Sequence, residues 1–167
     1  QNPNSDSIVI HNKEFKTTLK GKNGKFSGNF EAPKGFYQLF DGSKFAQLYF
    51  NEGFDLKITA DGKRFEPTLA FSGKGAAENN YLLQKKANDG KIRESFGNQL
   101  PDENILKAIL DKRLLDARSL LASGQYEKDF TPLMIAEYEK ENLRIMSDLV
   151  AVKAKENGIS VLKNTPA

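Results

Sequence analysis

The chain has 167 residues, of which 38% are hydrophobic and 28% are charged, and its net charge is +3. These values are typical of one globular domain, or of one domain with an extension, that buries a sizeable core. So small a net charge, carried by basic residues spread along the sequence, argues against a nucleic-acid partner. The absence of cysteine excludes disulfides, thiol catalysis and thiolate metal sites. No apolar run approaches the roughly 20 residues of a membrane-spanning helix.

Residues 1–73 carry the pattern of an antiparallel β-domain. Short runs of strand-forming residues alternate with turn-forming residues along this part of the chain. Asn23-Gly24 is the strongest turn signal, because both residues tolerate positive φ in a two-residue hairpin. The pattern predicts an antiparallel meander, sandwich or open barrel of about seven strands, at residues 7–11, 15–20, 25–30, 36–40, 44–50, 55–60 and 68–71.

Residues 74–167 are predicted to form a helical segment of about three helices, so the fold class is α+β. Residues 76–86 read as the first helix, which a polar link at residues 88–90 follows. The second helix is expected to have Pro101 in its first turn and to end near Ser123.

The third predicted helix has the clearest boundary signals. Thr131 is its expected cap, Pro132 its first residue and Asn157-Gly158 its end. Helical spacing predicts two buried apolar stripes. The stripe of the second helix is Ile105, Ile109, Leu110, Leu114, Ala117 and Leu121, and that of the third is Ile135, Tyr138, Ile145, Leu149 and Val152.

No motif in the sequence predicts a catalytic, cofactor-binding or metal-binding residue. Gly73-Lys74-Gly75 precedes a helix as phosphate-binding loops do, but Lys74 is not followed by Ser or Thr and no third glycine is present. We therefore interpret it as a tight strand-to-helix turn. His11 is the only histidine, and a zinc site or a catalytic triad needs more ligands or partners than this residue offers.

Two further groups of residues leave alternatives open. The carboxylate pairs Glu137/Glu141, Glu139/Asp148 and Asp111/Asp116 fall on lysine-rich helices, where a solvated charged face explains them; a glycosidase would need two of them in one cleft. The phenylalanines of the strands are interpreted as core residues. Tyr37, Tyr49 and Phe50 could instead line the mouth of a barrel that binds a small apolar ligand.

Residues 71–82 (FSGKGAAENNYL) resemble a segment of a known family. The family comprises envelope thiol–disulfide oxidoreductases, common in Bacteroidetes, that carry a C-terminal thioredoxin-like domain. Residues 24–27, 35–42 and 48–58 match the N-terminal region of the same proteins, so the resemblance covers about residues 8–86. Beyond residue 86, the predicted helices agree with the family only in being helices that follow in the same order. Residues 161–167 (VLKNTPA) resemble the beginning of the thioredoxin-like domain.

The resemblance implies a small β-domain of unknown function, then a helical segment, then a thioredoxin fold. This sequence has no Cys-x-x-Cys, so the redox activity cannot be placed on any of its residues. We expect a chain cut before the redox domain; a natural accessory protein built on the same module is the alternative. The implied function is that of a non-catalytic binding or positioning module rather than an enzyme. The implied location is the cell envelope or periplasm. The resemblance is also compatible with a longer parent protein that is anchored as a lipoprotein.

The expected partners follow from the same resemblance. They are the thioredoxin-like domain of the parent protein, client proteins, or a second copy of the chain, and we expect no cofactor. Two alternatives stay open beside this reading. One is a free-standing β-domain that binds a small ligand or a carbohydrate, and the other is a hydrolase that uses two of the carboxylates.

Overall fold

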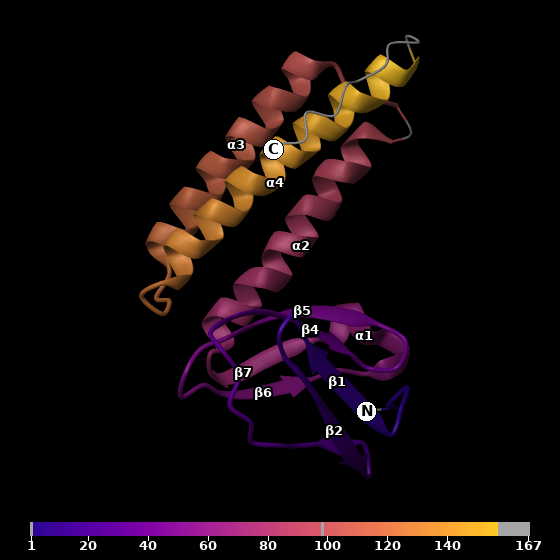
Figure 1. The fold of residues 1–167 in the computed structure, drawn as a ribbon, viewed down its shortest axis with the longest axis vertical. Coiled ribbons are helices and arrows are strands. Elements are labelled where there is room, and N and C mark those ends of the chain that lie inside the picture. Colours follow the sequence, from indigo (N-terminus) through magenta and orange to yellow (C-terminus); the bar gives the residue numbers. More distant parts are fainter. Residues whose placement is uncertain (1, 98, 157–167) are drawn as a thin grey trace. The chain divides into compact units, whose positions relative to one another are not determined.

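The computed structural model describes residues 2–97 and 99–156 (Figure 1). Within these residues the chain forms seven β-strands, all in antiparallel sheets, and four α-helices. The α+β class and the number of strands are therefore confirmed, and there is one helix more than predicted. The chain divides into two compact units, Gln1–Gly90 and Lys91–Ala167. The boundary predicted after residue 73 falls inside the first of these units.

A five-stranded antiparallel sheet forms most of the first unit. Its strands are β1 (Ser7–His11), β2 (Lys16–Lys22), β3 (Lys25–Phe26), β4 (Gly35–Phe40) and β5 (Phe45–Phe50), in the spatial order β3-β2-β1-β4-β5. Because β4 pairs with β1 and not with β3, the order is that of a Greek key. Of the three arrangements that the sequence left open, the simple meander is therefore wrong.

The strand predicted at residues 25–30 is only two residues long, and this shortening explains the strand order. At the β2–β3 turn, Asn23 and Gly24 have φ of 54° and 70°, as predicted for a tight hairpin. After Phe26 the chain leaves the sheet, and residues 27–34 connect it to β4. Gly28 lies against the side chain of Leu19, where a Cβ atom would meet it at 2.5 Å.

A second sheet completes the first unit. It consists of β6 (Asp55–Thr59) and β7 (Ala70–Lys74), joined by a single turn of 3-10 helix, η1 (Gly62–Arg64), and a short helix, α1 (Phe65–Thr68). The sequence did not predict η1 or α1. Both sheets contribute to one core, which is centred on Ile10, Leu39, Leu48, Phe65 and Phe71. Together they form a curled half-barrel rather than a complete sandwich (Figure 1).

Helix α2 (Ala76–Phe96) is ten residues longer than predicted. The expected polar link at residues 88–90 is helical instead. Asp89 is tied to the preceding turn, since its carboxylate accepts a 2.9 Å hydrogen bond from Lys85, four residues earlier. Gly90 stays in the helix although glycine is a poor helix former.

Replacing Gly90 with alanine is expected to stabilise α2. A Cβ atom added at this position would meet no atom within 4 Å, so the substitution brings no clash. The expected gain is about 0.5–1 kcal/mol, because alanine loses less backbone entropy than glycine on entering a helix. Thermal unfolding followed by circular dichroism at 222 nm measures it, and a lower midpoint for Gly90→Ala would show that this glycine is needed for another reason.

The second unit contains α3 (Glu103–Ser123) and α4 (Phe130–Glu156). Helix α3 begins two residues later than expected, because the Asp102 side chain caps it by accepting from the backbone N–H groups of Asn104 and Ile105. Helix α4 begins before Thr131, so the predicted cap is wrong. The backbone carbonyl of Asp129 accepts from Leu133 N–H instead, and Pro132 still lies in the first turn. The predicted end at residues 157–158 lies outside the described residues.

The predicted apolar stripes are correct in part. Leu110, Ala117 and Leu121 on α3, and Tyr138 and Leu149 on α4, are buried. At the beginning of α3 the buried face is displaced by one residue: Leu106 is buried, whereas Ile105 is 57% exposed. The stripe also contains a charged residue that an apolar pattern could not reveal, Arg113. Val152 of α4 is exposed as well.

Candidate functional groove

An open groove of about 2060 Å³ runs through the first unit. Its lining comes from β6 with its flanking turns, from residues 24–34 and from the inner side of the five-stranded sheet. The apolar side chains that line it include Leu19, Phe30, Phe50, Phe54, Leu56 and Ile58. Small-molecule pockets usually hold about 300–1,000 Å³. The groove is therefore large enough for a longer ligand.

Strand β6 gives this groove an unpaired backbone edge. It pairs with β7 on one side, and no other strand in the described part of the chain pairs with its second side. In an antiparallel strand, alternate residues direct their N–H and C=O groups away from the neighbour. All five residues of β6 line the groove, so an extended chain bound in the groove would lie beside this strand.

The lining of the groove is moderately acidic. Its residues include five carboxylates, among them Asp41 and Asp61, against three lysines. Asp41 accepts hydrogen bonds from Asn4 and from the backbone N–H groups of Ser43 and Lys44, so it fixes the β4–β5 turn. At Asp61, hydrogen bonds from the Asn2 side chain and the Lys63 backbone lower the pKa of the carboxyl group. The groove therefore favours an occupant with basic groups.

The aromatic residues considered for a ligand-binding mouth have different positions. Tyr37 and Tyr49 are 1% and 0% exposed and belong to the interior, so they cannot form such a mouth. Burial raises the pKa of the Tyr37 hydroxyl, which donates to the Pro33 carbonyl oxygen. Phe50 does line the groove, where its ring contacts the rings of Phe30 and Tyr37 at centroid distances of 5.7 and 5.3 Å.

The segment that carries the family resemblance has a structural role in this fold. The Asn79 side chain is fully buried; it accepts a 2.9 Å hydrogen bond from Tyr49 N–H and donates to the carbonyls of Tyr49 and Gly75 at 2.9 and 2.8 Å. Its amide thus pairs with the edge of β5 as a neighbouring strand would. Asn80 donates to the Phe71 carbonyl at 3.3 Å. The two asparagines join the beginning of α2 to both sheets.

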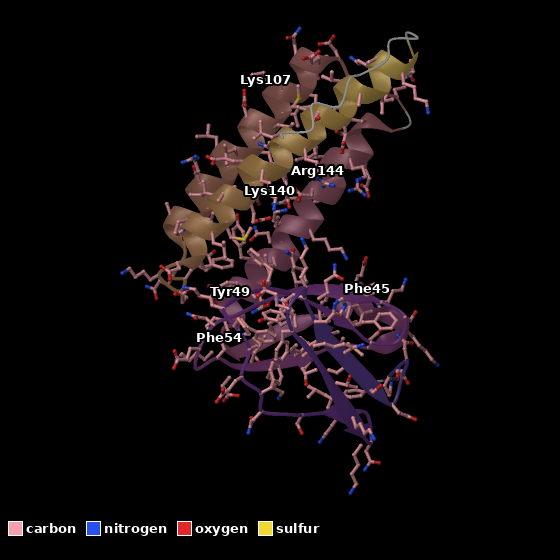
Figure 2. The ribbon with its side chains drawn as sticks, viewed as in Figure 1. Phe45, Tyr49, Phe54, Lys107, Lys140 and Arg144 are labelled. Atoms are coloured by element: carbon pink, nitrogen blue, oxygen red, sulfur yellow. The ribbon has the colours of Figure 1, made fainter. Side chains whose placement is uncertain are left out.

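The glycines of this segment form the turn that the sequence predicts. Gly73 and Gly75 have φ of 85° and 98°, a region that favours glycine. At Gly75 a Cβ atom would lie 2.2 Å from the ring of Phe54, which itself contacts the ring of Tyr49 at 6.0 Å (Figure 2). Close packing therefore explains this glycine.

Five of the six carboxylates considered for a hydrolase lie in ion pairs, and the sixth, Asp148, is exposed on α4. Asp111 and Asp116 each pair with a lysine four residues earlier on α3. Glu139 and Glu141 of α4 pair with arginines of α3 at 2.7 Å, and Glu137 lies 3.9 Å from Lys140. A glycosidase needs two carboxylates that face one substrate. The structure instead places the five paired carboxylates against cations.

Two other observations concern metals and membranes. His11 lies in β1 opposite Lys16 and Gln38, and the described residues include no group of three His, Cys, Asp or Glu side chains that could hold a metal ion. In the two described ranges, no helix has both the length and the apolar character needed to cross a membrane.

Comparisons with known proteins give no family for the chain. No family model, no curated protein and no solved structure matches it. The groove, with the unpaired edge of β6, is thus the feature from which a function can be argued. Sequence reasoning missed it, because strand patterns do not show how residues 27–34 are placed against β6.

Proposed function

We propose that this chain is a non-catalytic binding module whose groove receives an extended polypeptide segment. The observation that carries the proposal is the unpaired edge of β6 inside an apolar groove. Adding a strand to such an edge is a common mode of peptide recognition, in which backbone hydrogen bonds supply affinity and side-chain pockets supply specificity. A peptide with alternating apolar and basic residues fits best, since the lining combines apolar side chains with an excess of carboxylates.

The size of the groove also favours a peptide over the alternative of a small ligand. A compact ligand gains affinity when most of its surface is enclosed, and it would fill only part of about 2060 Å³. A strand of five residues, the length of β6, extends about 17 Å and can follow the whole edge. A carbohydrate remains the alternative occupant, and the titration described next includes one.

A capped ten-residue peptide of alternating valine and lysine is the first probe of the groove. We expect it to shift the backbone NMR resonances of residues 55–59 and 24–34 in a saturable way. The same peptide with all its amides N-methylated should not bind, because it cannot donate to the β6 edge. The valine–glutamate peptide should bind more weakly. Cellohexaose that bound in the groove while the peptide did not would favour the carbohydrate alternative.

We further propose that the module belongs to an envelope thiol–disulfide oxidoreductase, in which it would position the thioredoxin-like domain or a client protein. The resemblance of residues 8–86 supports this setting. The decisive observation is the coding sequence that follows Ala167. A Cys-x-x-Cys motif within a thioredoxin-like domain is expected there, and an open reading frame without one would remove the redox connection but leave the groove intact.

A further inference from the structure

The outer face of the five-stranded sheet differs in character from the face that lines the core. Alternation along β2 exposes Lys16, Thr18, Lys20 and Lys22, while Thr17, Leu19 and Gly21 are half-buried. The inner face of β1, β4 and β5 supplies the core residues Ile10, Leu39 and Leu48. The outer face of β1, β2, β4 and β5 therefore lies on the opposite side of the sheet from the groove, whereas Lys25 of β3 also belongs to the lining of the groove.

This outer face is basic. Lys16, Lys20 and Lys22 of β2 and Lys25 of β3 are all exposed, and we call these four residues the lysine row. Among the described strand residues whose side chains alternate onto this face, none is acidic. No ion pair is formed by the lysine row within the described parts of the chain. The net charge of +3 is thus distributed unevenly.

The register of the sheet places like charges against one another. Lys22 lies directly opposite Lys25 at the end of the β2–β3 hairpin. Cross-strand pairs of like charge destabilise a sheet, whereas a carboxylate at either position would stabilise it. Fold stability therefore does not explain the lysine row, but an external anion would.

The same face carries an exposed aromatic side chain at the opposite edge of the sheet, on β5. Phe45 of β5 is 51% exposed, and its ring stacks on that of Phe40 at 4.6 Å (Figure 2). Gln38 and Gln47, also exposed, lie opposite each other between these strands. Of the exposed residues named on this face, only Lys25 lines the groove.

We propose that the lysine row docks the first unit onto an anionic lipid surface, with Phe45 at the rim of the contact. All four cations are lysines, which act as point charges, and none is an arginine, which would recognise single phosphate or carboxylate groups bidentately. The lysine row is therefore suited to general attraction to an extended anionic surface rather than to recognition of a single phosphate or carboxylate group. Anionic headgroups attract each lysine near a membrane surface, and exposed aromatic rings sit at the same level. A nucleic acid or another soluble polyanion would be a different partner, and the test separates it from a lipid surface.

Co-sedimentation with vesicles tests the proposal. We expect binding to vesicles with 30% phosphatidylglycerol in phosphatidylcholine, none to phosphatidylcholine alone, and loss of binding in high salt. The variant Lys16→Gln/Lys20→Gln/Lys22→Gln/Lys25→Gln should bind at least about a hundredfold more weakly, at roughly fivefold per lysine. The matched control Lys107→Gln/Lys112→Gln/Lys128→Gln/Lys140→Gln changes the net charge equally, at exposed positions of the second unit.

The proposal holds if only the first variant loses binding. An equal loss in both variants would show attraction through net charge, and binding to neutral vesicles would show an apolar contact; either overturns it. Polyphosphate and single-stranded DNA are compared with vesicles of equal phosphate content. If either binds more tightly than the vesicles, the lysine row binds a soluble polyanion instead of a lipid surface. Circular dichroism of both variants checks that they remain folded, as expected for exposed side chains.

Discussion

Replacing Asn79 with leucine is expected to destabilise the first unit by about 3 kcal/mol or more. The substitution removes three hydrogen bonds of a side chain that is 0% exposed. It removes this partner from the N–H and C=O of Tyr49, whereas the carbonyl of Gly75 keeps the backbone N–H of residue 79, at 3.4 Å. Each unsatisfied buried polar group costs about 1–3 kcal/mol. Urea unfolding followed by circular dichroism measures the loss.

Gln84→Leu is the matched control for this prediction. Gln84 has the same amide group on the same helix, but its side chain is exposed. The same kind of change there should alter the free energy of unfolding by no more than about 0.5 kcal/mol. Equal effects of the two substitutions would mean that Asn79 contributes through helix propensity rather than through its contact with β5.

Replacing Arg113 with alanine is expected to destabilise the α3–α4 pair by about 2–4 kcal/mol. The side chain is 7% exposed, and its guanidinium bonds Glu141 and Asn142, each at 2.7 Å, and lies 4.4 Å from the centre of the Tyr138 ring. Arg113→Lys should have an intermediate effect, because lysine keeps the charge but not the planar fork that reaches both partners. Urea unfolding monitored at 222 nm distinguishes the three proteins.

The ion pair between Arg118 and Glu139 provides the comparison for Arg113. It joins the same two helices at the same 2.7 Å distance, but its side chains are 49% and 50% exposed. Solvent screens such a pair, so Arg118→Ala should cost less than about 1 kcal/mol. If the two alanine variants were equally destabilised, burial would not be what gives Arg113 its importance.

The elements that the sequence predicted correctly depend on local signals. The Asn23-Gly24 hairpin and the glycine turn before α2 are set by backbone preferences within a few residues. The pairing of β4 with β1 depends instead on contacts between distant parts of the chain, and the alternation within each strand is the same for a meander. The extension of α2 through Gly90 was missed because a weak helix former can be retained inside a longer helix.

The candidate site could not be predicted from the sequence for a related reason. The groove depends on residues 27–34, which line it together with β6 and carry no regular pattern. The lysine row could have been recognised in part, since Lys16 and Lys20 share one face of the strand predicted at residues 15–20; Lys22 lies beyond that predicted strand but within β2. That Lys25 and His11 join the same face follows only from the register of the strands.

Amide hydrogen exchange in β6 tests the central claim most directly. The protein is compared with and without the valine–lysine peptide, and exchange is read at single residues by NMR. In residues 55–59, alternate amides are bonded to β7, and the others point to the open edge. If a peptide strand pairs with this edge, the amides that are not bonded to β7 should exchange at least tenfold more slowly. Unchanged exchange along β6 while the peptide is bound would contradict the account.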